Sequence, residues 1–212
     1  ATSCSPASSV MAKKLFPDFK PYISMALTPM VLTGRLIKKE KPNAKVVFIG
    51  PCAAKKLEAS RRSIRSDVDF VLTFEEVMGM FVAKGVNLEQ ISVSEPLTEG
   101  TGSGRGFAVS GGVAEAVKNQ ILKDHPDMEV KVQAAEGLKN CKTMLMMAKA
   151  GRLNGYLLEG MACPGGCVAG AGTLQPVMKS STLVKKYVKE ADKQISSESD
   201  YSDNLNLLTE HG

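Results

Sequence analysis

The sequence lacks the long features that mark membrane, nucleic-acid-binding and disulfide-stabilised proteins. No apolar run approaches the roughly 18 residues that span a bilayer, so we expect no membrane partner. The net charge is only +5, and short basic runs such as Arg61-Arg62 indicate solvated surface rather than contact with nucleic acid. The five cysteines are odd in number and unevenly spaced, which disfavours a disulfide framework. No signal peptide is visible, and together these features predict a cytoplasmic protein.

The composition is that of a soluble globular protein. The 212 residues are 43% hydrophobic and 23% charged, and they suffice for one large domain or two small lobes. Strands and helices alternate along the chain, which predicts an α/β fold with mixed or parallel sheets flanked by helices. The strands are expected at Lys45–Ile49, which we predict to be buried, Val68–Leu72, Met128–Gln133 and about Tyr156–Leu158. The helices are expected at Val10–Phe16, Pro29–Lys39, from Thr73 onward, at Val113–Leu122, at Leu138–Ala150 and from Ser180 onward.

Local signals fix several of these boundaries. Thr73 is placed to cap the helix that follows it, with Glu76 as its capping-box partner three residues on. Pro29 suits the first turn of its helix, and Gly151 suits the C-terminal end of another. The stretch Gly100–Gly112 is glycine-rich, and the stretch Ser196–Asp203 is expected to be loose.

The most informative stretch is Met161-Ala162-Cys163-Pro164-Gly165-Gly166-Cys167. Two cysteines lie four apart around a Pro-Gly-Gly turn, directly after an apolar segment. Iron–sulfur clusters are held by closely spaced cysteine thiolates, and glycines let the backbone approach a large inorganic group. Two buried free cysteines in a glycine-rich loop are the alternative.

Two further cysteines extend this pattern. Cys52 follows the first strand, and Cys4 lies in a Ser-Cys-Ser-Pro turn at the start of the chain. Loops beyond the carboxyl ends of strands commonly form ligand sites in α/β proteins, so the three loops are candidates to converge on a four-thiolate cluster. Cys141 lies inside a predicted helix and is expected in the core. A structural zinc site built by the other four cysteines stays open, although the usual CxxC knuckles are missing.

The neighbours of these cysteines also suit a metal centre. Lys55 follows Cys52 by three residues, so its ammonium could stabilise an anionic centre; a solvated surface lysine is the alternative. Met161 could pack its thioether against a cofactor, although most methionines are simply core.

Three loops together resemble the signature motifs of [FeFe]-hydrogenases, whose patterns are TSCCPxW, MPCxxKxxE and ExMxCxxGCxxGGG. The corresponding segments here are Thr2–Pro6, Gly50–Glu58 and Glu159–Cys167, and Gly104–Gly112 resembles the glycine-rich loop of the family. The resemblance implies a fold like that of the C-terminal domain of the iron-only hydrogenase large subunit. Residues 1–178 would form the C-terminal part of the H-cluster domain, with room for two α/β lobes, and residues 179–212 a C-terminal helix and loose tail.

The resemblance also implies site residues and a cofactor. In the family, four cysteines hold a [4Fe–4S] cubane that is bridged to a di-iron subsite, and the centre interconverts two protons and two electrons with dihydrogen. By position, Cys52, Cys163 and Cys167 resemble cubane ligands, with Cys167 as the bridge. Lys55 matches a lysine that hydrogen-bonds an iron-bound cyanide. Met161 matches a methionine beside the di-iron subsite, and Phe107 an aromatic residue near the cluster. Ferredoxin or fused iron–sulfur domains would donate electrons.

The first motif departs from the family pattern. Cys4 falls at the proton-relay position and Ser5 at the ligand position, where a serine oxygen is a harder, less favoured partner for iron. Either Cys4 shifts by one residue to become the fourth ligand, which we favour here, or the site is incomplete. Gly50 replaces a methionine and the motif tryptophan is absent. The second motif and Thr28-Pro29-Met30 look more like the divergent, sensory branch.

The family domain also has an N-terminal half that is not in this sequence. We therefore expect a fragment with weak, sensory or no hydrogenase activity alone, whose partner is that missing half. The alternative function is a non-catalytic cluster-binding or assembly protein related to hydrogenases. Lys55 and Met161 favour the hydrogenase hypothesis, because a scaffold has less use for a cyanide partner and a di-iron packing residue.

Overall fold

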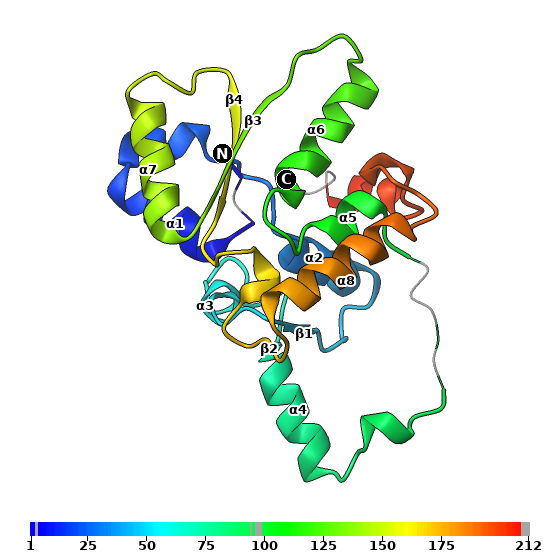
Figure 1. Cartoon of the computed structure of the whole chain (residues 1–212). Coiled ribbons are helices and arrows are strands. Elements are labelled where there is room, and N and C mark those ends of the chain that lie inside the picture. Colours follow the sequence, from blue (N-terminus) through cyan, green and yellow to red (C-terminus); the bar gives the residue numbers. More distant parts are fainter. Residues whose placement is uncertain (3, 94, 96–98, 209–212) are drawn as a thin grey trace.

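A computed structural model describes residues 1–2, 4–93, 95 and 99–208. It contains two separate parallel sheets of two strands each, with helices around them (Figure 1). The first sheet pairs β1 (Val47–Gly50) with β2 (Phe70–Thr73). The second pairs β3 (Lys131–Glu136) with β4 (Tyr156–Met161). The predicted α/β class with helix-flanked parallel sheets is confirmed.

The six expected helices are present in the expected order with altered ends, and α3 and α5 are two short helices that were not predicted. Their bounds are α1 (Pro6–Leu15), α2 (Pro29–Glu40), α3 (Ala54–Ala59), α4 (Phe74–Ala83), α5 (Gly102–Gly106), α6 (Gly112–Asp124), α7 (Leu138–Lys149) and α8 (Val177–Lys189). Short 3-10 helices lie at Pro17–Tyr22, Leu88–Gln90, Cys167–Ala169, Ser196–Glu198 and Ser202–Leu208. No described helix is long and apolar enough to cross a bilayer.

The local signals at three helix ends are confirmed. The Thr73 side chain accepts a hydrogen bond from the Glu76 backbone N–H, and the Glu76 carboxylate accepts one from the Thr73 N–H at 2.7 Å, which completes the capping box of α4. Pro29 is the first residue of α2, where its missing N–H costs nothing. Gly151 follows α7 with φ +76°, the left-handed conformation that favours glycine.

Other sequence-based boundaries were wrong. The helix expected at Val10 begins at Pro6, because proline suits a first turn, and the third strand begins at Lys131 rather than Met128. The glycine-rich stretch contains the short helix α5, whose start is capped by the Thr101 hydroxyl. The stretch expected to be loose forms two 3-10 turns, and residues 209–212 of the predicted tail lie outside the described residues. The domain boundary at residue 178 stays a prediction.

The second sheet is covered on both faces. Leu158 of β4 packs with Met144 of α7 in one hydrophobic cluster, while α1 packs on α7 through Ala12, Phe16 and Leu145. On the opposite face, Glu159 of β4 bonds the start of α6. The strand β4 is therefore buried between helices, and it ends at the loop that carries two cysteines.

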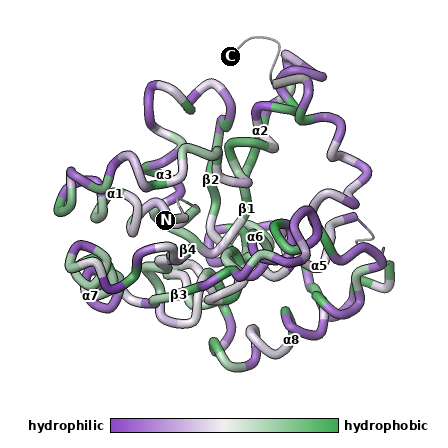
Figure 2. Tube along the Cα trace, turned by 90° about the horizontal axis from the view of Figure 1, so that it is seen from above, coloured by the Kyte–Doolittle hydropathy of each residue, from purple (hydrophilic) through white to green (hydrophobic). Residues whose placement is uncertain are grey.

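The first sheet is covered on one face only. Val71 of β2 packs with Met30 and Val31 of α2. The other face carries Val47, Ile49 and Phe70, which are 45%, 49% and 59% exposed. Both strands are coloured as largely hydrophobic (Figure 2). Parallel sheets are normally buried on both faces. The expectation that the first strand is buried is thus wrong for one face, because nothing in the described chain covers it.

Candidate functional site

The three cysteine loops converge on one cavity of about 450 Å³ between the two sheets. In Figure 1 the start of α1, the loop between β1 and α3, and the loop after β4 approach one another near the centre of the molecule. Every site residue predicted from the sequence lines this cavity: Cys4, Ser5, Cys52, Lys55, Phe107, Met161, Cys163 and Cys167. Ser3 of the first motif lies outside the described residues.

The loop after β4 has a tightly constrained backbone. Its turn is closed by a hydrogen bond from the Gly166 N–H to the Cys163 carbonyl at 3.0 Å. Gly165 and Gly166 have φ values of +98° and +92°, which side-chain-bearing residues rarely adopt. The Pro-Gly-Gly sequence therefore bends the chain so that Cys163 and Cys167 both reach the cavity.

This loop is tied to the glycine-rich loop before α6. The Ser110 N–H donates to the Gly165 carbonyl at 3.2 Å, and the Val168 N–H donates to the Ala108 carbonyl at 3.1 Å. The approach is close enough that a Cβ on Gly166 would lie 2.5 Å from the Ser110 nitrogen. Phe107 and Ala108 reach the cavity wall from this second loop.

The ammonium of Lys55 is buried and paired. Lys55 is 8% exposed, and its Nζ lies 2.7 Å from Oε2 of Glu58, one turn further along α3. A buried charge needs a partner, so the pair explains why lysine is tolerated in this wall. The alternative of a solvated surface lysine is ruled out by this burial. Because an ammonium has three donors, the pair with Glu58 leaves N–H groups for a ligand in the cavity.

Burial raises the pKa of three cysteine thiols that line the cavity. It raises the pKa of Cys167 to about 11, helped by the nearby Cys52 and Cys4 and opposed by Lys55. Burial, followed by the Cys52 thiol, raises the pKa of Cys163. Burial, followed by the Glu159 carboxylate, raises the pKa of Cys4, while Lys55 opposes the change. These thiols are protonated at neutral pH, so metal loading must displace protons.

The chemistry of the donor set fits a cluster better than a single ion. Four free cysteines line the cavity, and soft thiolates select iron–sulfur clusters or zinc. Within the described part of the chain, however, no three Cys, His, Asp or Glu side chains lie close enough together to hold one metal ion. The thiols are therefore spread around the cavity, as a cofactor of several atoms requires. This spacing disfavours the structural zinc alternative.

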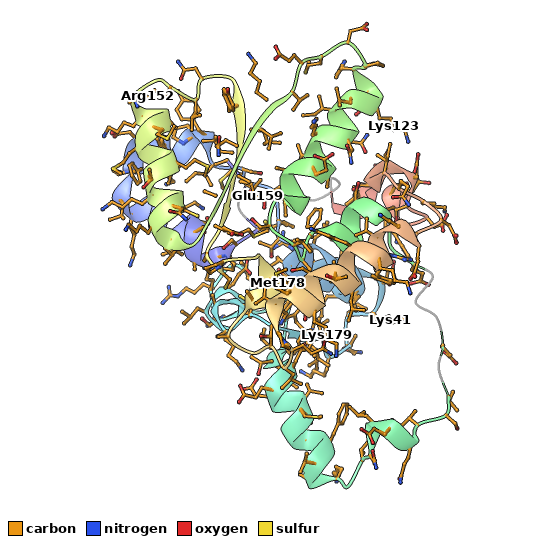
Figure 3. All side chains as sticks on the ribbon, in the orientation of Figure 1. Lys41, Lys123, Arg152, Glu159, Met178 and Lys179 are labelled. Atoms are coloured by element: carbon orange, nitrogen blue, oxygen red, sulfur yellow. The ribbon has the colours of Figure 1, made fainter. Side chains whose placement is uncertain are left out.

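Glu159 and Glu58 are buried carboxylates beside the site for which no role was predicted from the sequence. Glu159 is fully buried between β4 and α6 (Figure 3), where its carboxylate accepts hydrogen bonds from the backbone N–H groups of Gly111 at 2.7 Å and Ala114 at 2.6 Å. It thus caps α6 and fixes the glycine-rich loop. A carboxylate inside the apolar strand signals such a partner, and the three-residue spacing from Lys55 to Glu58 signals an ion pair on one helix.

Cys141 is confirmed as a core residue. It is 1% exposed on α7, and its Sγ lies 3.4 Å from the Ala135 carbonyl oxygen and 3.5 Å from that of Met161. It does not line the cavity, so it is separate from the four cysteines of the site. Met161 is also buried, and it does line the cavity.

Comparison with known proteins places the chain in a family. Residues 1–171 match the family model for the C-terminal domain of the iron only hydrogenase large subunit. The chain therefore belongs to this family, as the motif resemblance implied.

Individual relatives agree with this assignment. The chain is 31% identical over 218 residues to the periplasmic [Fe] hydrogenase large subunit of Nitratidesulfovibrio vulgaris, covering 84% of this chain and 51% of that protein. It is 29% identical over 222 residues to cytosolic iron-sulfur assembly component 3 of Rattus norvegicus, covering 82% and 46%. The chain thus spans about half the length of the curated relatives it matches.

Solved structures show the same fold. A variant of [FeFe]-hydrogenase HydA1 from Chlamydomonas reinhardtii superposes with a TM-score of 0.68 at 22% identity, covering 99% of this chain and 71% of that one. The expected hydrogenase C-terminal-domain-like fold is therefore confirmed.

Proposed function

We propose that this chain is an iron–sulfur oxidoreductase domain of [FeFe]-hydrogenase type and that it is part of a longer protein. One observation carries the proposal: thiols from three loops line a single cavity together with Lys55, Phe107 and Met161. A cluster-binding role needs only the thiols. A buried ammonium and a buried thioether beside them favour a cofactor with an anionic part.

The cofactor we propose is the H-cluster, a [4Fe–4S] cubane joined to a di-iron subsite. Cys52, Cys163 and Cys167 would hold the cubane, with Cys167 as the bridging ligand, and the fourth position falls at the corner formed by Cys4 and Ser5. When bound, the group supplies the redox centre at which two protons and two electrons are reversibly converted to dihydrogen.

The other residues would act on protons and on water. Lys55, held by Glu58, would offer its remaining N–H donors to an anionic ligand such as cyanide. The Cys4 thiol keeps its proton at neutral pH because burial and Glu159 raise its pKa, so it can donate a proton to a base in the cavity. Met161 and Phe107 line the wall with apolar surface, which limits access of water.

The chain alone is proposed to have weak, sensory or no hydrogenase activity. Its relatives are about twice as long, and the uncovered β1–β2 face of Val47, Ile49 and Phe70 is an apolar surface that the rest of the hydrogenase domain would cover. We propose that the N-terminal half of the hydrogenase domain, which the family resemblance implies, is the structural partner. Ferredoxin or a fused iron–sulfur domain would donate electrons, and a cytoplasmic location agrees with the free cysteines.

The second candidate is a non-catalytic iron–sulfur assembly protein. It is favoured by the relatives named as cytosolic iron-sulfur assembly components, which are 28–29% identical to this chain. Such a protein would load the cubane but not the di-iron subsite. The two candidates therefore differ in whether Lys55 has a ligand to bind.

Anaerobic reconstitution with iron and sulfide tests the proposal. We expect acid-labile sulfide and a reduced-state electron paramagnetic resonance (EPR) spectrum of a [4Fe–4S] cluster. Cys163→Ser should reduce cluster retention severalfold, whereas Cys141→Ala, which removes a thiol outside the cavity, should still load. A synthetic di-iron complex is then added to the reconstituted protein. If wild type retains the di-iron complex and Lys55→Met retains less of it, the hydrogenase type is supported. If wild type retains none of the di-iron complex, the assembly protein is supported. Absence of iron uptake would refute both, and vigorous hydrogen evolution would refute the expected weak activity.

A further inference from the structure

Cys4 and Ser5 are neighbours at one corner of the cavity, and both line it. The backbone at Ser5 is extended, with φ −89° and ψ 105°. Successive side chains of an extended segment point to opposite sides. The Cys4 thiol and the Ser5 hydroxyl therefore point to different parts of the cavity, and they cannot both be ligands of the same iron.

The thiol of Cys4 lies on the side of Lys55 and Cys167. The charged groups that interact with it are Glu159 and Lys55, and the Cys167 thiol interacts with it in turn. The Cys163 thiol interacts with those of Cys52 and Cys167.

The hydroxyl of Ser5 lies on the side of Cys163. Its Oγ accepts a hydrogen bond from the backbone N–H of Ala162 at 3.4 Å, the residue directly before Cys163. Ser5 is the N-cap residue of α1, a position at which serine normally accepts a bond from its own helix, yet it makes no such bond. The side chain is turned away from α1 and toward the loop that carries two cysteines.

We propose that the cubane site of this chain has three thiolate ligands, Cys52, Cys163 and Cys167, and one exchangeable iron at the Ser5 corner. This inference rests on the proposed function, and it differs from the sequence-based prediction that Cys4 moves into the fourth position. A hydroxyl is a hard and weak ligand for iron in a cluster, so this iron would accept a small thiolate in its place. Cys4 keeps its thiol for proton transfer.

An iron without a thiolate ligand is lost first on oxidation. With ferricyanide as the one-electron oxidant, a [4Fe–4S]2+ cluster gives a [3Fe–4S]+ cluster and one Fe2+, while the electron reduces ferricyanide to ferrocyanide. The iron at the Ser5 corner is the one that leaves. A cluster with four thiolates resists this conversion.

The test compares wild type, Ser5→Cys, Ser5→Ala and Cys4→Ser after anaerobic reconstitution and one equivalent of ferricyanide. Iron per chain and the EPR spectrum are the readouts, so no hydrogenase activity is needed. We expect wild type, Ser5→Ala and Cys4→Ser to lose one iron in four and to show the [3Fe–4S]+ spectrum. Ser5→Cys should keep all four irons. Added 2-mercaptoethanol should shift the spectrum of reduced wild type but not that of reduced Ser5→Cys.

Two results would overturn the inference while leaving the cluster itself intact. Retention of four irons by wild type, with loss of one in Cys4→Ser, would make Cys4 the fourth ligand. Equal loss of iron from wild type and Ser5→Cys would show that Ser5 is not at the exchangeable corner. If neither wild type nor Ser5→Cys takes up iron, the proposed function fails and this inference fails with it. If Ser5→Cys takes up iron and wild type does not, the result would support the position of the fourth iron at Ser5.

Discussion

The carboxylate of Glu159 accepts a hydrogen bond from the backbone N–H of Ala114 at 2.6 Å, and this bond joins the strand before the cysteine loop to the start of α6. The other carboxylate oxygen accepts a bond from the Gly111 N–H at 2.7 Å. Because Glu159 is fully buried, water cannot replace either bond. One side chain thus fixes the glycine-rich loop against the site.

Replacing Glu159 with glutamine should destabilise the protein. The amide keeps one acceptor oxygen, but its NH₂ group faces a backbone N–H, so one buried donor loses its partner at a cost of about 1–3 kcal/mol. Urea unfolding of the apo protein measures this cost. Glu115→Gln, on the exposed face of the same helix turn, is the control and should change stability by less than about 0.5 kcal/mol. Equal effects of the two substitutions would contradict the role of Glu159.

The pair of Lys55 and Glu58 gives a second prediction. Glu58→Gln leaves the Lys55 ammonium buried beside a neutral group, and breaking a buried pair in this way typically costs about 3–5 kcal/mol. The exposed pair of Lys186 and Glu190 at the C-terminal end of α8 is the control, because Glu190→Gln should cost less than about 1 kcal/mol. Thermal unfolding of both variants checks the difference. If Glu58→Gln unfolds at the wild-type temperature, Lys55 is not held as the structure indicates.

Most of the site could be predicted from the sequence because its parts are local. Cys163, Cys167, Cys52 and Lys55 are placed by short loops at strand ends, and short loops leave few alternatives. The capping box of Thr73 and Glu76 is local in the same way. These features needed no knowledge of distant contacts.

The remaining features depend on parts of the chain that are far apart in sequence. Glu159 contacts the start of α6, more than forty residues earlier, and no periodic pattern announces that pairing. The direction of Ser5 depends on Ala162, 157 residues away. The exposure of Ile49 was also missed, since a continuous apolar strand looks the same whether or not its second face is covered.

Alkaline pH should destabilise the apo protein through its buried thiols. Burial raises the pKa of Cys167 from 9.0 to about 11, so the folded state holds a proton that the unfolded state releases. The contribution of the protonated Cys167 thiol to the free energy of unfolding is fully present below pH 9 and is lost as the pH rises through 11. The free energy of unfolding, measured by urea in the presence of a reductant at pH 8, 9.5 and 11, should fall more steeply for wild type than for Cys167→Ser. Parallel curves would contradict the shift.

The turn at Gly166 gives a prediction with a matched control in Gly155. Both residues have positive φ, +92° and +77°, so an alanine at either position is strained; at Gly166 the ψ of −158° adds to this strain, because that backbone conformation is essentially restricted to glycine. Only at Gly166 would the new Cβ also collide with backbone, 2.5 Å from the Ser110 nitrogen, whereas nothing lies within 4 Å at Gly155. Gly166→Ala should therefore destabilise the apo protein more than Gly155→Ala in urea unfolding, and it should lower cluster retention while Gly155→Ala does not. Equal losses of stability would mean that the cysteine loop and the glycine-rich loop can separate at little cost. The cysteine loop would then not fix Ala108 in the cavity wall.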